Sequence, residues 1–288
     1  MLNKLTKQQL IISLKELGIQ NGDNLFVISD LANIGYLHQN KDKTLNNWIE
    51  IFDELVGVKG GYMLPAYNKG SMFFKTKKNF NKTTASYCGS FSNFLINNKN
   101  FIRSKHPLMS VVGRGEYILP IIEKHDHKSL SYTYLNDFIK LKNSKILMLG
   151  TYNKTHFPQT LHLAQENLGI TKKNIFKGIV QINFLDEHGI KRLFKRYDYG
   201  GCTRGAFKLY PLLIKHNILK KGIVGNSISA LVDAKKSYDI LLNQIKLNPK
   251  IYLCDNKNCI DCFGNPYLVG IKSFNFFTNK ILKIIKIK

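Results

Sequence analysis

The sequence predicts a layered α/β/α protein with a mostly parallel sheet and an added antiparallel hairpin. In the first half, short apolar segments alternate with amphipathic helical segments, which is typical of a parallel layered core. Near residue 178 the pattern changes to two strand-like segments around a polar turn. The 288 residues contain no repeat or low-complexity linker, so we expect a single domain over 1–288 with a cysteine-bearing tail at about 251–288.

The elements of the first half follow from apolar spacing and from glycine and proline breaks. Apolar residues at helical spacing end at Gly18 and predict a first helix over 4–18. Further helices are predicted at 45–56, 90–97, 117–127 and 134–141, and strands at 24–28, 109–113 and 145–149. Residues 60–65 are predicted as a turn that leads into another strand. The polar, lysine-rich stretch 66–87 reads as a long loop, and such loops are usually functional or mobile.

The second half departs from this alternation. Segments 178–185 and 191–197 flank Asp186-Glu-His-Gly189 and predict the hairpin. Helices are expected at 207–216 and 229–245, with a short extended piece at 223–225 between them. The last fifteen residues are basic and apolar, and we expect them to dock on the core or to fray rather than to bind a membrane.

The composition limits the function classes. The net charge of +24 is compatible with nucleic-acid binding, but the lysines are spread along the chain and no nucleic-acid-binding signature is present. A positive field also attracts phosphorylated small molecules, so we predict small-molecule substrates and no nucleic acid. Without a signal peptide or an apolar run of about 20 residues, the expected compartment is the cytoplasm. A homo-oligomer stays possible.

The stretch around His162 is the strongest candidate site from the residues alone. The apolar strand 145–149 leads into a loop and then a helix that Pro158 can start and Gly169 can end. His162 therefore lies just past the carboxyl end of a strand, where open α/β sheets bind their ligands. Glu166 is four residues further along and neighbours His162 on the helix. A neutral imidazole suits proton removal from an amine, and Glu166 could orient it, whereas Gln165 is expected on the helix surface.

Five segments, in order, resemble one enzyme family. They are Gly22-Asp-Asn-Leu-Phe-Val-Ile-Ser29-Asp30-Leu-Ala-Asn-Ile-Gly35, Gly60-Gly-Tyr-Met-Leu-Pro65-Ala-Tyr67, Arg103-Ser-Lys-His106-Pro107-Leu-Met-Ser110, Thr160-Leu-His162-Leu-Ala-Gln-Glu166 and Val224-Gly225-Asn226 through Leu231-Val-Asp-Ala. They span roughly residues 8–253, and the Arg-Ser-x-His-Pro segment is the most specific. Together they resemble the aminoglycoside 3-N-acetyltransferases, which transfer an acetyl group from coenzyme A to an amine of a sugar.

The resemblance implies roles for particular residues. His162 is then the general base, with Glu166 as its acid partner. Contacts to acetyl-CoA or another acyl-CoA are expected from the strand ends and loops, namely from Ser29, Asp30, Gly35, Ser110 and Thr155. His106 and Tyr67 are expected to contact the acceptor.

The sequence departs from the family pattern near the proposed base and in two further segments that bear on the acceptor. Gln165 replaces the first acid after the histidine motif, and 207–216 lacks the later acid. The lysine-rich insertion near 69–82 and the cysteine tail lie outside the family pattern and suggest a substrate other than an antibiotic. By analogy with members of the wider family, we expect an amino sugar carried on a nucleotide, as in surface-polysaccharide biosynthesis. An aminoglycoside antibiotic, or a non-catalytic binding role on the same scaffold, remains an alternative.

The cysteines suggest a metal site. Cys254, Cys259 and Cys262 have Cys-x4-Cys-x2-Cys spacing, and Cys202 follows two glycines in a distant loop. Four thiolates could form a closed structural Zn²⁺ site that fixes the tail to the body. The alternative is free thiols in a reducing compartment, with Cys88 unpaired in either case.

Overall fold

The computed structural model describes residues 5–72, 79–152, 156–174 and 177–285. Within these residues seven strands form one mixed sheet in the order β10-β11-β7-β1-β2-β6-β5. The strands are β1 (Asn24–Ser29), β2 (Gly61–Pro65), β5 (Ile102–Arg103), β6 (Val111–Arg114), β7 (Ser144–Leu149), β10 (Leu219–Val224) and β11 (Ser227–Asp233). The α/β class predicted from the sequence is confirmed.

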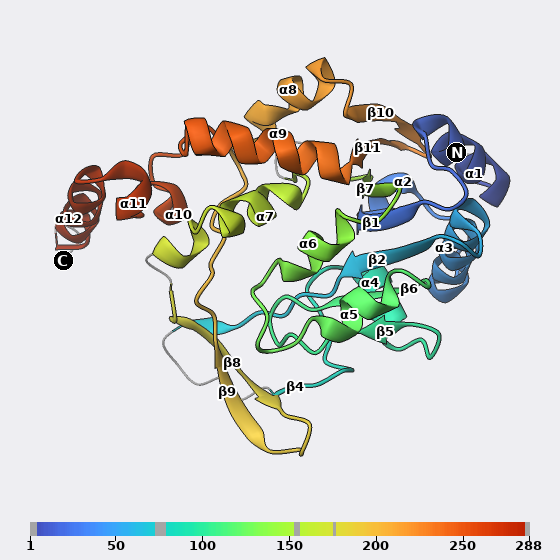
Figure 1. Cartoon of the computed structure of the whole chain (residues 1–288), viewed down its shortest axis with the longest axis horizontal. Helices are drawn as coiled ribbons and strands as arrows, with labels where there is room; N and C mark the ends of the chain where they lie inside the picture. The colour runs from blue at the N-terminus through green and yellow to red at the C-terminus, as the bar shows by residue number, and fades with distance from the viewer. Residues whose placement is uncertain (1–4, 73–78, 153–155, 175–176, 286–288) are drawn as a thin grey trace.

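Helices cover both faces of this sheet (Figure 1). Along β1, Leu25 and Val27 enter one hydrophobic core, and Phe26 and Ile28 enter the other, as strand alternation requires. The core containing Leu25 takes side chains from α1 (Lys7–Leu17), α2 (Leu31–Ile34), α3 (Lys41–Val56) and α4 (Ser90–Ile96). The core containing Phe26 takes them from α5 (Leu119–Lys124), α6 (Thr133–Phe138), α7 (Thr160–Asn167), α8 (Tyr210–Lys215) and α9 (Ala234–Leu247).

The sheet is parallel only at its centre. Strand β1 pairs in parallel with β2 and β7, whereas the pairings outside these strands are antiparallel, so the expectation of a mostly parallel sheet needs correction. The sequence also predicted a helix from Ser229, but residues 227–233 form β11 and Asp233 caps α9 through Lys236 N at 2.9 Å. A short apolar run fits a buried strand or a helix equally well, which explains the error.

The predicted hairpin is present and belongs to a second, small sheet. Strands β8 (Val180–Leu185) and β9 (Lys191–Lys195) pair in antiparallel fashion and project from the body (Figure 1). Strand β8 also pairs with β3 (Ser71–Met72) and β4 (Asn79–Phe80). The lysine-rich stretch predicted as a loop is therefore partly ordered by the hairpin.

The tail forms three helices, α10 (Ile260–Phe263), α11 (Pro266–Val269) and α12 (Lys272–Ile285). Leu268 is buried in the core that contains Phe26, and Lys173 lies 4.2 Å from the ring centre of Tyr267. The part of the tail around Leu268 is thus docked on the body, whereas docking of the last fifteen residues stays a prediction. None of the described helices combines the length and apolarity that crossing a membrane requires.

Two histidines are buried as a stacked pair beneath the hairpin. The rings of His106 and His125 lie 4.7 Å apart, and both residues are at most 2% exposed. Nδ1 of His106 accepts hydrogen bonds from the backbone N–H groups of Leu108 (3.2 Å) and Met109 (2.9 Å). Burial lowers the pKa of His125 to about 4 and holds the pKa of His106 well below its ordinary value.

This pair predicts loss of stability in mild acid. Below about pH 6.5 the unfolded chain protonates these histidines but the folded chain does not, so the free energy of unfolding falls as the pH drops toward 4. Each histidine contributes up to about 1.4 kcal/mol per pH unit. Urea unfolding at pH 7 and pH 5.5 measures the effect, and 0.5 M salt controls for surface repulsion. Equal stability at both pH values in high salt would contradict the prediction.

Candidate active site

Two cavities meet at the carboxyl ends of the parallel strands. The first has a volume of about 490 Å³ and is lined by the ends of β1 and β2 and by the loop after β7. The second, of about 550 Å³, is lined by residues of α7, of the segment after the hairpin and of the lysine-rich stretch. Tyr67, Tyr87 and Gln159 line both. Molecules bound in the two cavities would therefore face each other across these side chains.

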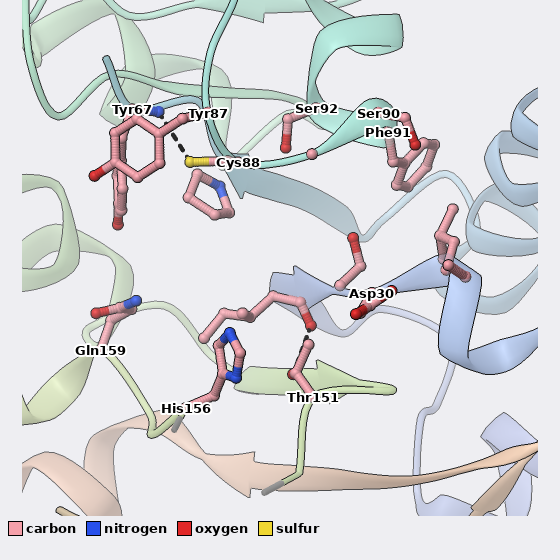
Figure 2. Close-up of a pocket in the computed structure, with 16 residues that line it drawn as sticks. Asp30, Tyr67, Tyr87, Cys88, Ser90, Phe91, Ser92, Thr151, His156 and Gln159 are labelled. Carbon is pink, nitrogen blue, oxygen red and sulfur yellow. Dashed lines mark hydrogen bonds between the residues drawn. The ribbon is translucent and has the colours of Figure 1, made fainter. Parts of the chain in front are cut away.

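The first cavity is held open by contacts between the loops after β1 and β7. The N–H of Asp30 donates to Leu149 O at 2.8 Å, and Thr151 Oγ1 donates to Ile28 O at 3.2 Å. Gly150 permits this approach, because a Cβ there would lie 2.6 Å from Asp30 O and its φ is +67°. Figure 2 shows Tyr67, Tyr87 and Cys88 along one wall and His156 and Thr151 along the opposite wall.

The predicted acyl-CoA residues separate into three groups. Ser29 and Asp30 line the first cavity. Gly35 lines neither cavity; it packs instead against Asn226 and Leu5. Thr155 lies outside the described residues.

Ser110 and His106 of the Arg-Ser-x-His-Pro segment are fully buried and line neither cavity. The hydroxyl of Ser110 donates to Ala66 O at 2.6 Å and accepts from Arg103 Nε at 3.0 Å. Nδ1 of His106 accepts hydrogen bonds from the backbone N–H groups of Leu108 and Met109 and so stabilises the turn that follows it. Their contacts thus support the cavity wall that carries Tyr67.

His162 lies on the wall of the second cavity in a restrained position. It is 6% exposed, and its ring stacks on Tyr132 with the ring centres 4.8 Å apart. Gly200 packs so closely that a Cβ there would lie 2.6 Å from Nδ1. Burial lowers the pKa of His162 to about 4, so the imidazole is neutral at physiological pH.

Gln165, not Glu166, holds the imidazole. Nδ1 of His162 lies 2.7 Å from Gln165 Oε1, and a carbonyl oxygen can only accept. Nδ1 therefore carries the hydrogen, and the basic lone pair is on Nε2. The prediction that Gln165 lies on the helix surface is wrong, since it is fully buried.

Glu166 contacts the backbone of Tyr132 and not the imidazole of His162, which was its expected partner. Its Oε2 accepts from the N–H of Tyr132 at 3.0 Å, and its carboxyl neighbours Asp198. Burial, reinforced by Asp198, raises the pKa of Glu166 to about 8. Asp198 in turn accepts hydrogen bonds from the N–H and the hydroxyl of Ser131. Glu166 thus holds the backbone at Tyr132, and the imidazole of His162 stacks on the ring of Tyr132.

Several residues around His162 were missed by sequence reasoning, namely Tyr132, Gln165, Arg196, Asp198 and Gly200. Tyr132, Arg196, Asp198 and Gly200 come from segments distant in the chain, so spacing could not connect them with His162. Gln165 is only three residues away but was expected on the helix surface. The one visible signal was the Gly200-Gly201 pair, because adjacent glycines allow a close backbone approach.

The four predicted metal-ligating cysteines are brought together. The sulfur atoms of Cys202, Cys254, Cys259 and Cys262 all lie within 4.8 Å of one another. A hydrogen bond from Cys262 lowers the pKa of Cys202 to about 5. Four converging thiols, three of them buried, could hold a metal ion. Cys88 is remote, and its Sγ accepts from Tyr67 N at 3.2 Å.

Known structures share this fold. The aminoglycoside acetyltransferase AAC(3)-IVa apoenzyme superposes with a TM-score of 0.75 at 20% identity, covering 93% of this chain and 99% of that chain. A histidine-to-alanine mutant of the same enzyme, in complex with a gentamicin, gives 0.77 at 21% identity with the same coverage. AAC-IIIb, as a binary complex with CoASH, gives 0.68 at 19% identity, covering 84% of this chain and 97% of that chain.

Sequence comparison identifies the family. No curated protein sequence matches the chain. The sequence pattern of one family, described as aminoglycoside 3-N-acetyltransferase, matches residues 26–246, which is most of the chain. The protein therefore belongs to the aminoglycoside 3-N-acetyltransferase family, whose members are acetyl-CoA-dependent N-acetyltransferases.

Proposed function

We propose that this protein transfers an acetyl group from acetyl-CoA to the amine of an amino sugar. The observation that carries the proposal is the buried, neutral His162 beside the junction of two cavities. The complex of the similar AAC-IIIb with CoASH supports an acyl-CoA site. In this proposal the first cavity binds acetyl-CoA beside Ser29, Asp30 and Thr151, and the second binds the acceptor.

The reaction follows from this arrangement. The amine nitrogen attacks the thioester carbonyl, a C–N bond forms and the C–S bond breaks. The N–H proton passes to Nε2 of His162, and the coenzyme leaves as a thiolate that takes up a proton. The attacking nitrogen becomes more acidic as its bond to carbon forms, so a weakly basic imidazole can accept its proton at that stage.

Direct transfer is favoured over an acyl-enzyme. Cys88 is the one described cysteine on the cavity walls, and burial raises its pKa to about 12. A thiol of that pKa is a poor nucleophile at neutral pH.

Two acceptor classes fit a sugar amine. Similar structures of AAC(3)-IVa in complex with a gentamicin and with apramycin favour an aminoglycoside. The lysine-rich insertion and the net charge of +24 favour an amino sugar linked to a nucleotide.

Substitution of His162 tests the mechanism. His162→Ala should lower kcat/KM by roughly 10²–10⁴-fold, the usual contribution of a general base. Gln165→Glu should raise the pKa of His162, because a carboxylate beside Nδ1 stabilises the cation, and should move the acidic limb of the pH–rate profile upward. Free-thiol release measures both effects, and exposed His188→Ala is the matched control. Near-normal turnover by a folded His162→Ala protein would refute the assignment.

We also propose that the four-cysteine cluster holds a structural Zn²⁺. Tetrahedral Zn–S bonds of about 2.3 Å place the sulfurs roughly 3.8 Å apart, which the cluster can reach with small shifts. Cys202 is two residues from Gly200, which packs on His162. A metal that links Cys202 to the tail would therefore also fix the backbone against the imidazole.

Metal analysis tests this site. The purified protein should contain about one Zn per chain, and Cys259→Ser should lose it and lower Tm by roughly 5–10 °C. Cys88→Ser should keep the metal, because Cys88 is outside the cluster. Wild-type protein without bound metal after growth in zinc-supplemented medium would argue for free thiols.

A further inference from the structure

The acceptor cavity has an unusual charge. Its described lining includes the cations Arg196 and Lys69 and no Asp or Glu. The residues outside the described ranges cannot add an acidic side chain, because none of them is Asp or Glu. An aminoglycoside carries several ammonium groups, and a site for it needs carboxylates to compensate them.

Arg196 is the central cation of this cavity. Its side chain is only 10% exposed, and its guanidinium lies over the rings of Tyr199 (5.1 Å) and Tyr132 (5.9 Å). Nε and Nη2 of Arg196 have no hydrogen-bond partner among the described residues. A buried guanidinium with unpaired N–H groups is costly, and an oxyanion with small local adjustment would pair them.

The nearby acids lie outside the described lining of the cavity. Asp198 forms an ion pair with Arg196, 3.6 Å from Nε, and it lines a different hollow that includes residues of the hairpin. Glu166 is buried behind Tyr132, and its carboxyl neighbours Asp198. Lys69 is exposed at the rim, 6.0 Å from the ring centre of Tyr87. The described lining that an acceptor meets thus carries two cations and no acid.

We infer that the acceptor is an amino sugar bearing an oxyanion, a phosphate or a carboxylate, and that Arg196 is the residue that recognises this group. The inference rests on the proposed function for the identity of the sugar amine. Lys69 attracts the same group from the rim. Polycationic aminoglycosides are rejected by the same two cations.

Binding to the protein saturated with coenzyme A tests the inference. The probes are glucosamine, glucosamine 6-phosphate, UDP-glucosamine, glucosaminuronic acid and gentamicin, titrated by calorimetry. At least one anionic sugar should bind about tenfold or more tightly than glucosamine, and gentamicin more weakly. The phosphate and carboxylate members show which oxyanion is preferred. Equal binding of all sugars, no detectable binding, or tighter binding of gentamicin overturns the inference.

Variants tie the preference to Arg196. Arg196→Gln should abolish the anionic preference, and Arg196→Lys should keep part of it, because the charge remains while the paired N–H donors are lost. Lys69→Gln, an exposed change, should weaken the preference about two- to threefold even if Arg196→Gln proves unstable. Exposed Lys59→Gln controls for the loss of one surface charge. An unchanged preference in both Arg196→Gln and Lys69→Gln would refute the assignment.

Thiol release from acetyl-CoA with the same panel separates the two proposals. Selective binding of anionic sugars without acetylation would leave the inference standing and remove the proposed function. Efficient acetylation of gentamicin alone or of neutral glucosamine alone would support the proposed function and overturn the inference of an anionic acceptor.

Discussion

The site depends on the parallel pairing of β1 with its neighbours β7 and β2. This register places Ser29 opposite Leu149, so the chain leaves β1 and β7 at the same edge of the sheet. The N–H of Asp30 donates a hydrogen bond to the carbonyl of Leu149, which joins the loops that follow β1 and β7. Gly150 permits this close approach because it has no side chain. The first cavity lies over these loops, and the loop after β7 leads directly into α7 and His162. The antiparallel strands outside this centre widen the sheet without changing the edge where the chemistry is proposed.

The imidazole is positioned by polar groups that are themselves buried. Gln165 fixes its tautomer, Tyr132 supports one ring face, and Gly200 comes within contact of the ring. Tyr132 is in turn held by Glu166, whose carboxyl is next to Asp198 and its partner Arg196. A single connected group of side chains thus links the proposed base to the cation that faces the acceptor. Removing a buried member leaves its partners unsatisfied, so effects within this group should not be additive.

The sequence was sufficient where the signal is local. The α/β class, the hairpin, the helix that carries His162 and the convergence of four cysteines could all be predicted from periodicity, turns and spacing. It failed where tertiary packing decides: 227–233 became a strand because β7 offers it an edge, and Gln165 became the partner of His162 because Glu166 points to Tyr132. Positions i+3 and i+4 on a helix are both neighbours of a residue, and only the surrounding segments select between them. His106 and Ser110 look functional in sequence, yet their contacts build the wall behind Tyr67.

The protonation state of His162 is the most direct test of the account. An ¹⁵N NMR titration of histidine-labelled protein, with His162→Ala used to assign the signal, reports both the pKa and the tautomer. The account predicts a neutral ring with the proton on Nδ1 throughout the range from pH 8 to pH 5, because burial lowers the pKa to about 4 and Gln165 accepts from Nδ1. Titration near pH 6.5, or a neutral ring with the proton on Nε2, would contradict it.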